Sequence, residues 1–257
     1  MSKRYETLIS VILFLAVLSF LLGWKLRVGN ESPEDRTEYQ RRINITAENI
    51  RTFGASDDPN DALRIYGVNV VHTPPFKKRF FGYGVYLGEG MVLSAAHVVG
   101  SLSQYNPLHI LIAGLDLPAT ILKVGSPDHI DLALLSIDQE RLPVNLRLRR
   151  NPLCKEVLRV GTDVIVVYPE RTARSQIISP RLVPAQYRSK YPTLITEPQG
   201  SGSGVFNAER KCLIGIMSAQ VPKYAYQNDS RRVIFREEGF AGYFVSAANS
   251  ANLIPVQ

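Results

Sequence analysis

The chain has 257 residues, enough for one large domain or two small ones, and its 45% hydrophobic content excludes a generally disordered protein. Its formal net charge is +7, but the lysines and arginines are scattered and form no basic stripe, which argues against nucleic-acid binding. With 16 Pro and 18 Gly, the composition favours an all-β or mainly β fold over a helical bundle.

The first predicted element is an apolar run without charge from Leu8 to Trp24. A helix of this length nearly spans a hydrocarbon core of about 30 Å. A cleaved secretory signal is the alternative, but no small-residue cleavage pattern follows the run, and Trp24 with Lys25 is typical of a membrane interface. We therefore predict that residues 1–29 form a single N-terminal transmembrane helix that stays as an anchor.

Residues 30–61 are polar and charged, with turn-forming residues near their end. We interpret them as a juxtamembrane spacer with a short helix over Glu34 to Ile50. Positive charges flank the apolar run on both sides, but the free N-terminal amine and the acidic residues after the run favour a cytoplasmic N-terminus. The body of the chain is then expected outside the cytoplasm.

From residue 62 to residue 257 the pattern is short and strand-like, rich in Val, Ile, Tyr and Phe and divided by Gly, Pro, Asn and Asp turns. Many short strands with few helical windows predict barrels or sandwiches. A less strand-like segment from Arg141 to Lys155 divides the set. We expect an all-β fold of two barrels, the first over about residues 62–140 and the second over about 156–250.

The two cysteines, Cys154 and Cys212, form no CxxC motif and are too few for a metal site. In an oxidising compartment they could pair in a disulfide, and in the cytosol they would be ordinary buried thiols. The sequence leaves both possibilities open.

Three motifs in the order His, Asp, Ser carry the chemistry. His97 closes an SAAH run, Asp131 directly precedes the apolar LALL, and Ser201 lies in GSGSG before the apolar VFN. Ser-His-Asp hydrolysis needs a hydroxyl activated by an imidazole, and a carboxylate that fixes the tautomer of that imidazole. These three residues are the predicted catalytic triad, and no metal or cofactor is implied.

These stretches resemble the trypsin-like (chymotrypsin-fold) serine proteases. GYGVYLGEGMVLSAAHVV looks like the strand, turn and catalytic histidine of that family, DLALL is similar to its aspartate motif, and PQGSGSGVFN is similar to the bacterial form PGNSGSGVFN. The resemblance covers about Tyr66 to Leu253, is nearest to the bacterial HtrA/Deg-like branch, and implies a two-barrel fold on the periplasmic side of a bacterial inner membrane. Because the sequence ends at Gln257, we expect no PDZ domain.

Each predicted catalytic residue has a competitor nearby. Asp128 lies close to Asp131 but sits in a Ser-Pro turn, whereas Asp131 leads into an apolar strand. Choosing Ser203 instead of Ser201 would shift the following Val-Phe strand by two residues and lose the match to the family. The remaining histidines lack the Ala-Ala-His-Val-Val context of His97 and are less suited to catalysis: His72, His109 and His129.

The resemblance places the oxyanion hole at the backbone N–H groups of Gln199 and Ser201. The family has Gly at position 199, and a side chain there resists the usual backbone conformation, so we expect a hole that forms when substrate arrives or that uses a different peptide orientation. Animal digestive proteases carry Asp where this chain has Gly200. That Asp receives the new N-terminus after zymogen cleavage, so we expect no such activation step.

The resemblance also implies the substrate-binding residues. An edge strand would run beside the substrate backbone, and no carboxylate falls at the base of the primary pocket, so a small or medium apolar residue is expected before the scissile bond rather than Lys or Arg. The predicted strand residues are Ser218, Ala219, Gln220 and Val221, and the predicted pocket residues are Ile195, Ala219 and Gly242.

Together these features predict a membrane-anchored serine endopeptidase that cleaves proteins or peptides through an acyl-enzyme. Two alternatives remain. One is a chymotrypsin-fold pseudoprotease that acts as a binding module because Gln199 prevents the oxyanion hole from forming. The other is an anchored scaffold whose barrels bind partners. The expected partners are protein or peptide substrates and the membrane, with no nucleic acid, and the oligomeric state is left open.

Overall fold

The computed structural model describes residues 32–53, 58–73, 79–100, 107–126, 128–154, 158–196, 200–229 and 232–250, of which 224–238 and 249–250 are described by their backbone alone. The predicted transmembrane segment Leu8 to Trp24 lies outside these ranges. Within them, no helix combines the length and the apolar character needed to cross a bilayer.

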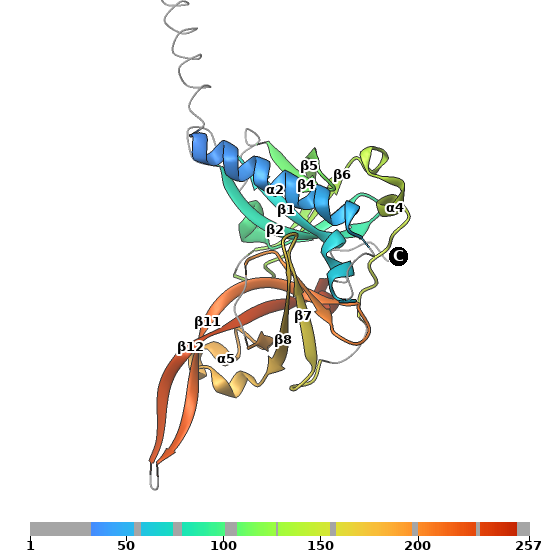
Figure 1. Cartoon of the computed structure of the whole chain (residues 1–257). Helices are drawn as coiled ribbons and strands as arrows, with labels where there is room; N and C mark the ends of the chain where they lie inside the picture. Colours follow the sequence, from blue (N-terminus) through green and yellow to red (C-terminus); the bar gives the residue numbers. More distant parts are fainter. Residues whose placement is uncertain are drawn as a thin grey trace, which may run out of the picture.

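Two closed six-stranded antiparallel barrels form the body of the molecule (Figure 1). This confirms the predicted all-β, two-barrel fold. The strand order is β1-β2-β3-β6-β5-β4 in the first barrel and β10-β11-β12-β9-β8-β7 in the second. The strands are β1 Gly67–His72, β2 Phe80–Gly88, β3 Met91–Ser94, β4 Leu108–Ile112, β5 Leu115–Val124, β6 Ala133–Ile137, β7 Asp163–Val167, β8 Thr172–Ile178, β9 Leu194–Ile195, β10 Gly204–Asn207, β11 Leu213–Asp229 and β12 Arg232–Ser246.

The barrel interiors are filled by the Val, Ile and Leu side chains that mark the strands in the sequence. Every residue of β3 is buried, as are the last four residues of β7. The two faces of β7 pack in different cores, because Val164 and Val166 belong to one apolar cluster and Ile165 and Val167 to the other. The short helices lie in the connections between strands. They are η1 Asp61–Tyr66, α3 Ala96–Val99, η2 Gln139–Arg141, α4 Val144–Arg147, η3 Pro180–Leu182, α5 Ala185–Arg188 and η4 Ala247–Ser250.

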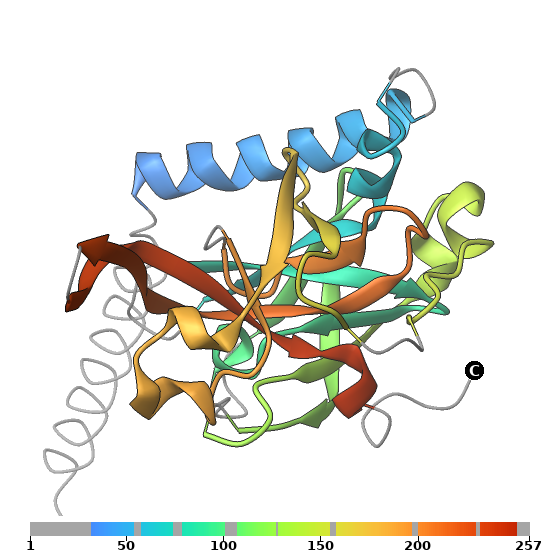
Figure 2. The same ribbon diagram turned by 90° about the horizontal axis from the view of Figure 1, so that it is seen from below.

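The longest helix that the structure describes is α2, Pro33–Arg51, where the sequence predicts a helix over residues 34–50. Ser32 caps it by accepting a hydrogen bond from the Asp35 N–H at 3.1 Å, and Pro33 occupies its first turn. The helix lies along the first barrel (Figures 1 and 2), and its buried Thr46 accepts a hydrogen bond from the Gly114 N–H at 3.0 Å. The predicted spacer is therefore packed against the folded body.

The β11–β12 hairpin is the longest strand pair that the structure describes. Its register continues from Gly215↔Ser246 to Asp229↔Arg232, and the ribbon extends away from the second barrel (Figures 1 and 2). The part of the hairpin near Met217 and Phe244 lies in the core of the second barrel.

Cys154 and Cys212 are joined in a disulfide with their Cα atoms 5.2 Å apart. It fastens the connection between the barrels to the start of β11, where the Cys154 N–H donates to the Leu213 carbonyl at 2.9 Å. The bond closes a loop with a sequence separation of 58 residues. The pairing that the sequence leaves open is thus present in the structure.

Replacing both cysteines with alanine should lower the free energy of unfolding by about 4 kcal/mol, because a closed loop of this size restricts the unfolded chain. The melting temperature should fall by roughly 10 °C. Thermal unfolding of the wild type and the Cys154→Ala/Cys212→Ala variant measures the difference. Adding a thiol reductant should reproduce the fall in the wild type and leave the double variant unchanged; equal melting temperatures for the two unreduced proteins would contradict the prediction.

Candidate active site

His97 is presented by the single helical turn α3, directly after β3. The turn is anchored because Ala96, Val98 and Val99 are all buried, whereas the His97 side chain is 33% exposed. The Ala95 carbonyl accepts the Val98 N–H at 3.1 Å and closes the turn. Three apolar residues thus fix the backbone while the imidazole faces outward.

Asp131 is 4% exposed and holds His97 by two contacts. Its Oδ2 lies 2.6 Å from His97 Nδ1, and its Oδ1 accepts the His97 backbone N–H at 2.9 Å. Ser218 Oγ donates to the same Oδ2 at 2.5 Å. Burial acts to raise the pKa of the Asp131 carboxyl, but the hydrogen bonds from His97 and Ser218 outweigh it and hold that pKa below its ordinary value. The carboxylate therefore stays charged and orients the ring.

Ser201 lies in the tight turn that precedes β10. The Tyr83 N–H donates to the Ser201 carbonyl at 3.1 Å, and the Gly202 N–H donates to the Met217 carbonyl at 2.8 Å. Gly202 has φ +87°, and a Cβ there would lie 2.0 Å from the Tyr83 carbonyl oxygen, so only glycine fits. The turn is thereby tied to both barrels.

The Ser201 hydroxyl donates to the Ser218 carbonyl at 3.3 Å, and within the described ranges it makes no hydrogen bond to His97. Catalytic hydrogen bonds are often long or misaligned before substrate binds. Ser218 contacts two members of the predicted triad: its carbonyl accepts from the Ser201 hydroxyl, and its own hydroxyl donates to Asp131.

Ser203, the alternative nucleophile, is completely buried, and its hydroxyl donates to the Gly200 carbonyl at 2.7 Å. Ser201 is partly exposed. The structure thus gives the two serines different environments, with Ser203 stabilising the turn that Ser201 occupies.

The competing histidines and aspartate lie elsewhere in the structure. His72 ends β1, and burial lowers its pKa. His109 on β4 lies 2.6 Å from Asp116 on β5, through Nδ1 and Oδ1, on the hairpin that packs against α2. Asp128 and His129 are exposed in the loop before β6.

The predicted substrate strand begins at an irregularity in β11. Met217 pairs with Phe244 and Ala219 with Tyr243, so Ser218 is the extra residue of a bulge, which explains how its side chain reaches Asp131. β10 pairs with β11 only up to Ile216. Beyond it, among the strand pairs that the structure describes, Ser218 to Val221 have β12 on one side and no strand on the other.

The predicted pocket residues meet beside this strand. Ile195 on β9 pairs with Gly242 on β12 and is completely buried. Tyr243 follows, with its ring centroid 4.8 Å from that of Tyr191. Among the residues that the structure describes, the surroundings of Ile195 and Tyr243 are thus apolar and aromatic.

The predicted oxyanion-hole residue Gln199 lies outside the described residues, and its partner Ser201 lies inside them. Gly200, between them, has no room for a side chain, because a Cβ there would lie 2.4 Å from Cε2 of the Tyr83 ring. In the described part of the chain, no three His, Cys, Asp or Glu side chains gather closely enough to hold a metal ion.

Comparisons with known proteins agree with this geometry. Residues 82–216, more than half of the chain and all three predicted catalytic positions, match the family model described as trypsin-like peptidase domain. The chain belongs to the trypsin-like peptidase family. It is a serine endopeptidase by its family and its fold.

Solved structures with the same fold are distant from this peptidase in sequence. The active form of the Rv3671c protease from M. tuberculosis has 18% identity and a TM-score of 0.51, over 76% of this chain and 82% of that one. Kallikrein-related peptidase 10 has 16% identity and a TM-score of 0.50, over 74% of this chain and 93% of that one. A sequence comparison with curated proteins found no match.

Proposed function

We propose that the chain is a membrane-anchored serine endopeptidase in which Ser201 attacks the peptide carbonyl, His97 acts first as base and then as acid, and Asp131 orients His97. The observation that carries the proposal is the chain of contacts His97–Asp131–Ser218–Ser201, built around one buried carboxylate. The mechanism requires the Ser201 hydroxyl to leave the Ser218 carbonyl and to bond to His97 Nε2.

The contacts of Asp131 determine which nitrogen of His97 carries a proton and which can accept one. With His97 Nδ1 donating to the carboxylate, the other ring nitrogen, Nε2, is free to accept the Ser201 proton as Oγ bonds to the substrate carbonyl carbon. The same nitrogen then gives that proton to the leaving amine, and a water repeats the cycle on the acyl-enzyme. The negative oxygen of each tetrahedral intermediate would be met by the backbone N–H groups of Ser201 and Gln199.

The substrates are proposed to be proteins or peptides bound in extended form along Ser218 to Val221. The side of β11 without a partner strand offers backbone groups to such a segment, as in other cases of strand addition. Ile195, Ala219 and Gly242 would form the primary pocket. The buried, apolar Ile195 supports a small or medium apolar side chain as the proposed occupant.

The location is proposed to be the extracytoplasmic side of a membrane, with the anchor formed by Leu8 to Trp24. The Cys154–Cys212 disulfide supports this placement because such bonds persist in oxidising compartments and are rare in the cytosol. The apolar run supports the anchoring.

A phosphonate probe tests the proposal directly. A fluorophosphonate should label the full-length protein, and peptide mapping should place the label on Ser201 and not on Ser203. Peptidyl phosphonates that carry Ala or Val next to the phosphorus should label faster than the matched Lys probe. Absence of labelling would leave a binding protein with a peptidase fold, and faster labelling by the Lys probe would overturn the apolar pocket.

A further inference from the structure

Tyr83 on β2 lies between the nucleophile turn and the rest of the molecule. Its backbone N–H donates to the Ser201 carbonyl at 3.1 Å, and its carbonyl accepts from Ser94 Oγ at 2.6 Å. One strand residue of the first barrel thus ties the residue before Gly202 to β3. The side chain of Tyr83 makes a second and separate set of contacts.

The Tyr83 ring fills the space beside Gly200. A Cβ on Gly200 would lie 2.4 Å and 2.7 Å from two ring carbons, so the aromatic face packs where a side chain at residue 200 would be. Tyr168 meets the Tyr83 ring edge-on, with centroids 5.1 Å apart at 80°. Burial raises the pKa of Tyr168, and its hydroxyl has the Ser203 side chain and the Gly200 backbone as neighbours. Two aromatic rings therefore support the turn that carries Ser201.

The Tyr83 hydroxyl is held from the second barrel. It donates to Glu170 Oε1 at 2.7 Å, from the turn between β7 and β8. Burial and then this carboxylate raise the pKa of Tyr83, so the phenol keeps its proton and remains a donor. The ring is thus fixed at its hydroxyl as well as at its backbone.

Helix α2 holds Tyr83 and Glu170 from the other side. The Arg42 guanidinium lies 5.7 Å from the Tyr83 ring centroid and 4.6 Å from that of Phe81. It is oriented by two hydrogen bonds, to Glu38 at 2.6 Å and to the buried Asn69 at 2.7 Å. Arg42 is therefore a well-defined contact between the helix and β2.

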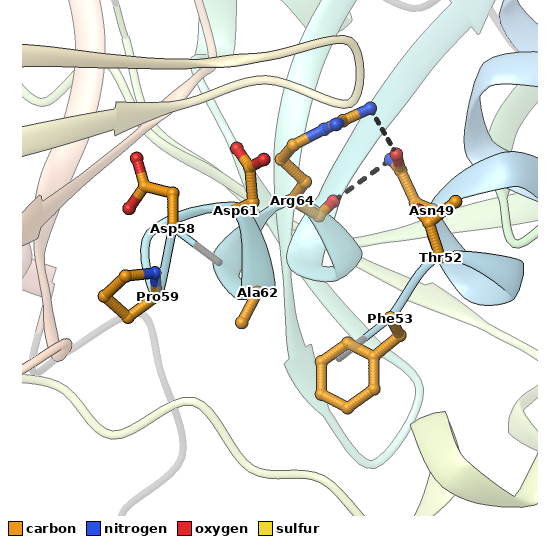
Figure 3. Close-up of a pocket in the computed structure, with 8 residues that line it drawn as sticks. All are labelled: Asn49, Thr52, Phe53, Asp58, Pro59, Asp61, Ala62 and Arg64. Carbon is orange, nitrogen blue, oxygen red and sulfur yellow. Dashed lines mark hydrogen bonds between the residues drawn. The ribbon is translucent and has the colours of Figure 1, made fainter. Parts of the chain in front are cut away.

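A second contact from α2 reaches the turn that carries Glu170. Asn49, near the end of the helix, donates to the Pro169 carbonyl at 2.6 Å. Arg64 donates to Asn49 Oδ1 at 2.7 Å and also reaches the Pro169 carbonyl, as Figure 3 shows for the Asn49–Arg64 pair. In both overall views the β7–β8 hairpin reaches toward α2 (Figures 1 and 2). The helix therefore fixes both partners of the Tyr83–Glu170 hydrogen bond.

We infer that Tyr83 is the positioning residue of the Gly200–Ser203 turn and that α2 holds it in place through Arg42 and Asn49. The inference rests on the proposed role of Ser201 as the nucleophile. Tyr83 acts through the backbone of residues 200 and 201 and touches no reacting atom. Its loss should therefore impair the chemical step more than substrate binding.

Replacing Tyr83 tests this role in the full-length protein. Tyr83→Ala should lower kcat by about 10²-fold, the cost of a small misplacement of a catalytic group, with KM within about threefold of the wild type. Tyr83→Phe keeps the ring over Gly200 and should recover kcat to within about tenfold. A Tyr83→Ala kcat within twofold of the wild type, or a loss that falls on KM alone, would overturn the inference.

Helix α2 offers a matched pair of variants that leave the barrel cores intact. Arg42 and Arg51 both pair with a glutamate of the same helix, but the Arg51 side chain is 73% exposed and pairs with Glu48, whereas Arg42 pairs with Glu38 and also reaches Asn69 and the rings. Arg42→Ala should lower kcat by about tenfold, and Arg51→Ala should leave it unchanged. Equal kcat values for the two variants would exclude α2 from the positioning of Ser201.

Hydrogen exchange supplies a readout that does not depend on catalysis. In Tyr83→Ala the Gly202 and Ser203 amides should exchange faster, while the Val205 amide in β10 keeps its protection. Unchanged exchange at residues 202 and 203 would overturn the positioning role. Failure of the proposed function shows itself differently, as a wild-type protein that phosphonate probes do not label at Ser201.

Discussion

Ser201→Ala should lower kcat by about 10⁶-fold, the loss seen when the nucleophile of a Ser-His-Asp site is removed. The substitution deletes the hydroxyl that forms the acyl bond. It leaves the turn in place, since the Tyr83 N–H bonds to the Ser201 carbonyl and not to its side chain. Peptide cleavage assays on the purified full-length protein, with melting temperatures measured in parallel, give the result.

Ser203→Ala is the control for that substitution. It removes the hydroxyl that bonds to the Gly200 carbonyl and creates a small buried void, so it should lower the melting temperature slightly and keep kcat within about tenfold of the wild type. If Ser203→Ala abolishes turnover and phosphonate labelling while Ser201→Ala retains both, the nucleophile is Ser203.

The second large effect is expected for Asp131→Asn, which should reduce kcat by about 10⁴-fold. The carboxylate accepts from both the ring and the backbone of His97, whereas an amide placed at Oδ2 would offer N–H groups to Nδ1. His97 would then carry its proton on Nε2 and be unable to accept from Ser201. The rate is measured at a pH where the wild type is fully active.

A second His–Asp pair in the protein provides a control for the Asp131→Asn substitution. His109 and Asp116 form a pair with the same 2.6 Å separation on the first barrel, away from Ser201. Asp116→Asn should leave kcat unchanged. A fall of less than tenfold in Asp131→Asn, or an equal fall in Asp116→Asn, would be inconsistent with Asp131 as the residue that orients the base.

Much of the fold follows from the sequence because buried strands leave a strong apolar signal. β8 is the strand that the pattern misses, since four of the first five residues of TARSQII are polar and only the last two residues are buried. The continuous pairing of β11 with β12 is not predicted either, because strand pairing is a property of the fold and leaves no local pattern in the sequence.

The docking of α2 could not be read from periodicity either. Its two buried residues, Thr46 and Asn49, are polar, and its apolar contacts with the first barrel are made by the partly buried Ile50 and by Ala47 against Gly114. A broad apolar stripe marks a packed helix in a sequence, whereas here polar residues occupy the most buried positions of the packed face. The helix is therefore predictable while its position is not.

In the candidate site, too, some residues could be predicted from the sequence and others could not. His97, Asp131 and Ser201 stand in local motifs whose residue types follow from the chemistry. The hydroxyl contact of Ser218 with Asp131 depends on a bulge, which is a property of strand pairing and has no local sequence pattern. The role of Tyr83 is not predicted because its sequence context is that of an ordinary strand residue. Its ring leaves no space for a side chain at residue 200, and the glycine at that position is the only sign of this contact in the sequence.

The bulge at Ser218 joins the proposed substrate strand to two members of the triad. The residue borders the side of β11 where a substrate strand would pair, its hydroxyl bonds to Asp131, and its carbonyl accepts from the Ser201 hydroxyl. Under the proposed mechanism, the nucleophile must therefore exchange its hydrogen bond to Ser218 for one to His97 before it can attack.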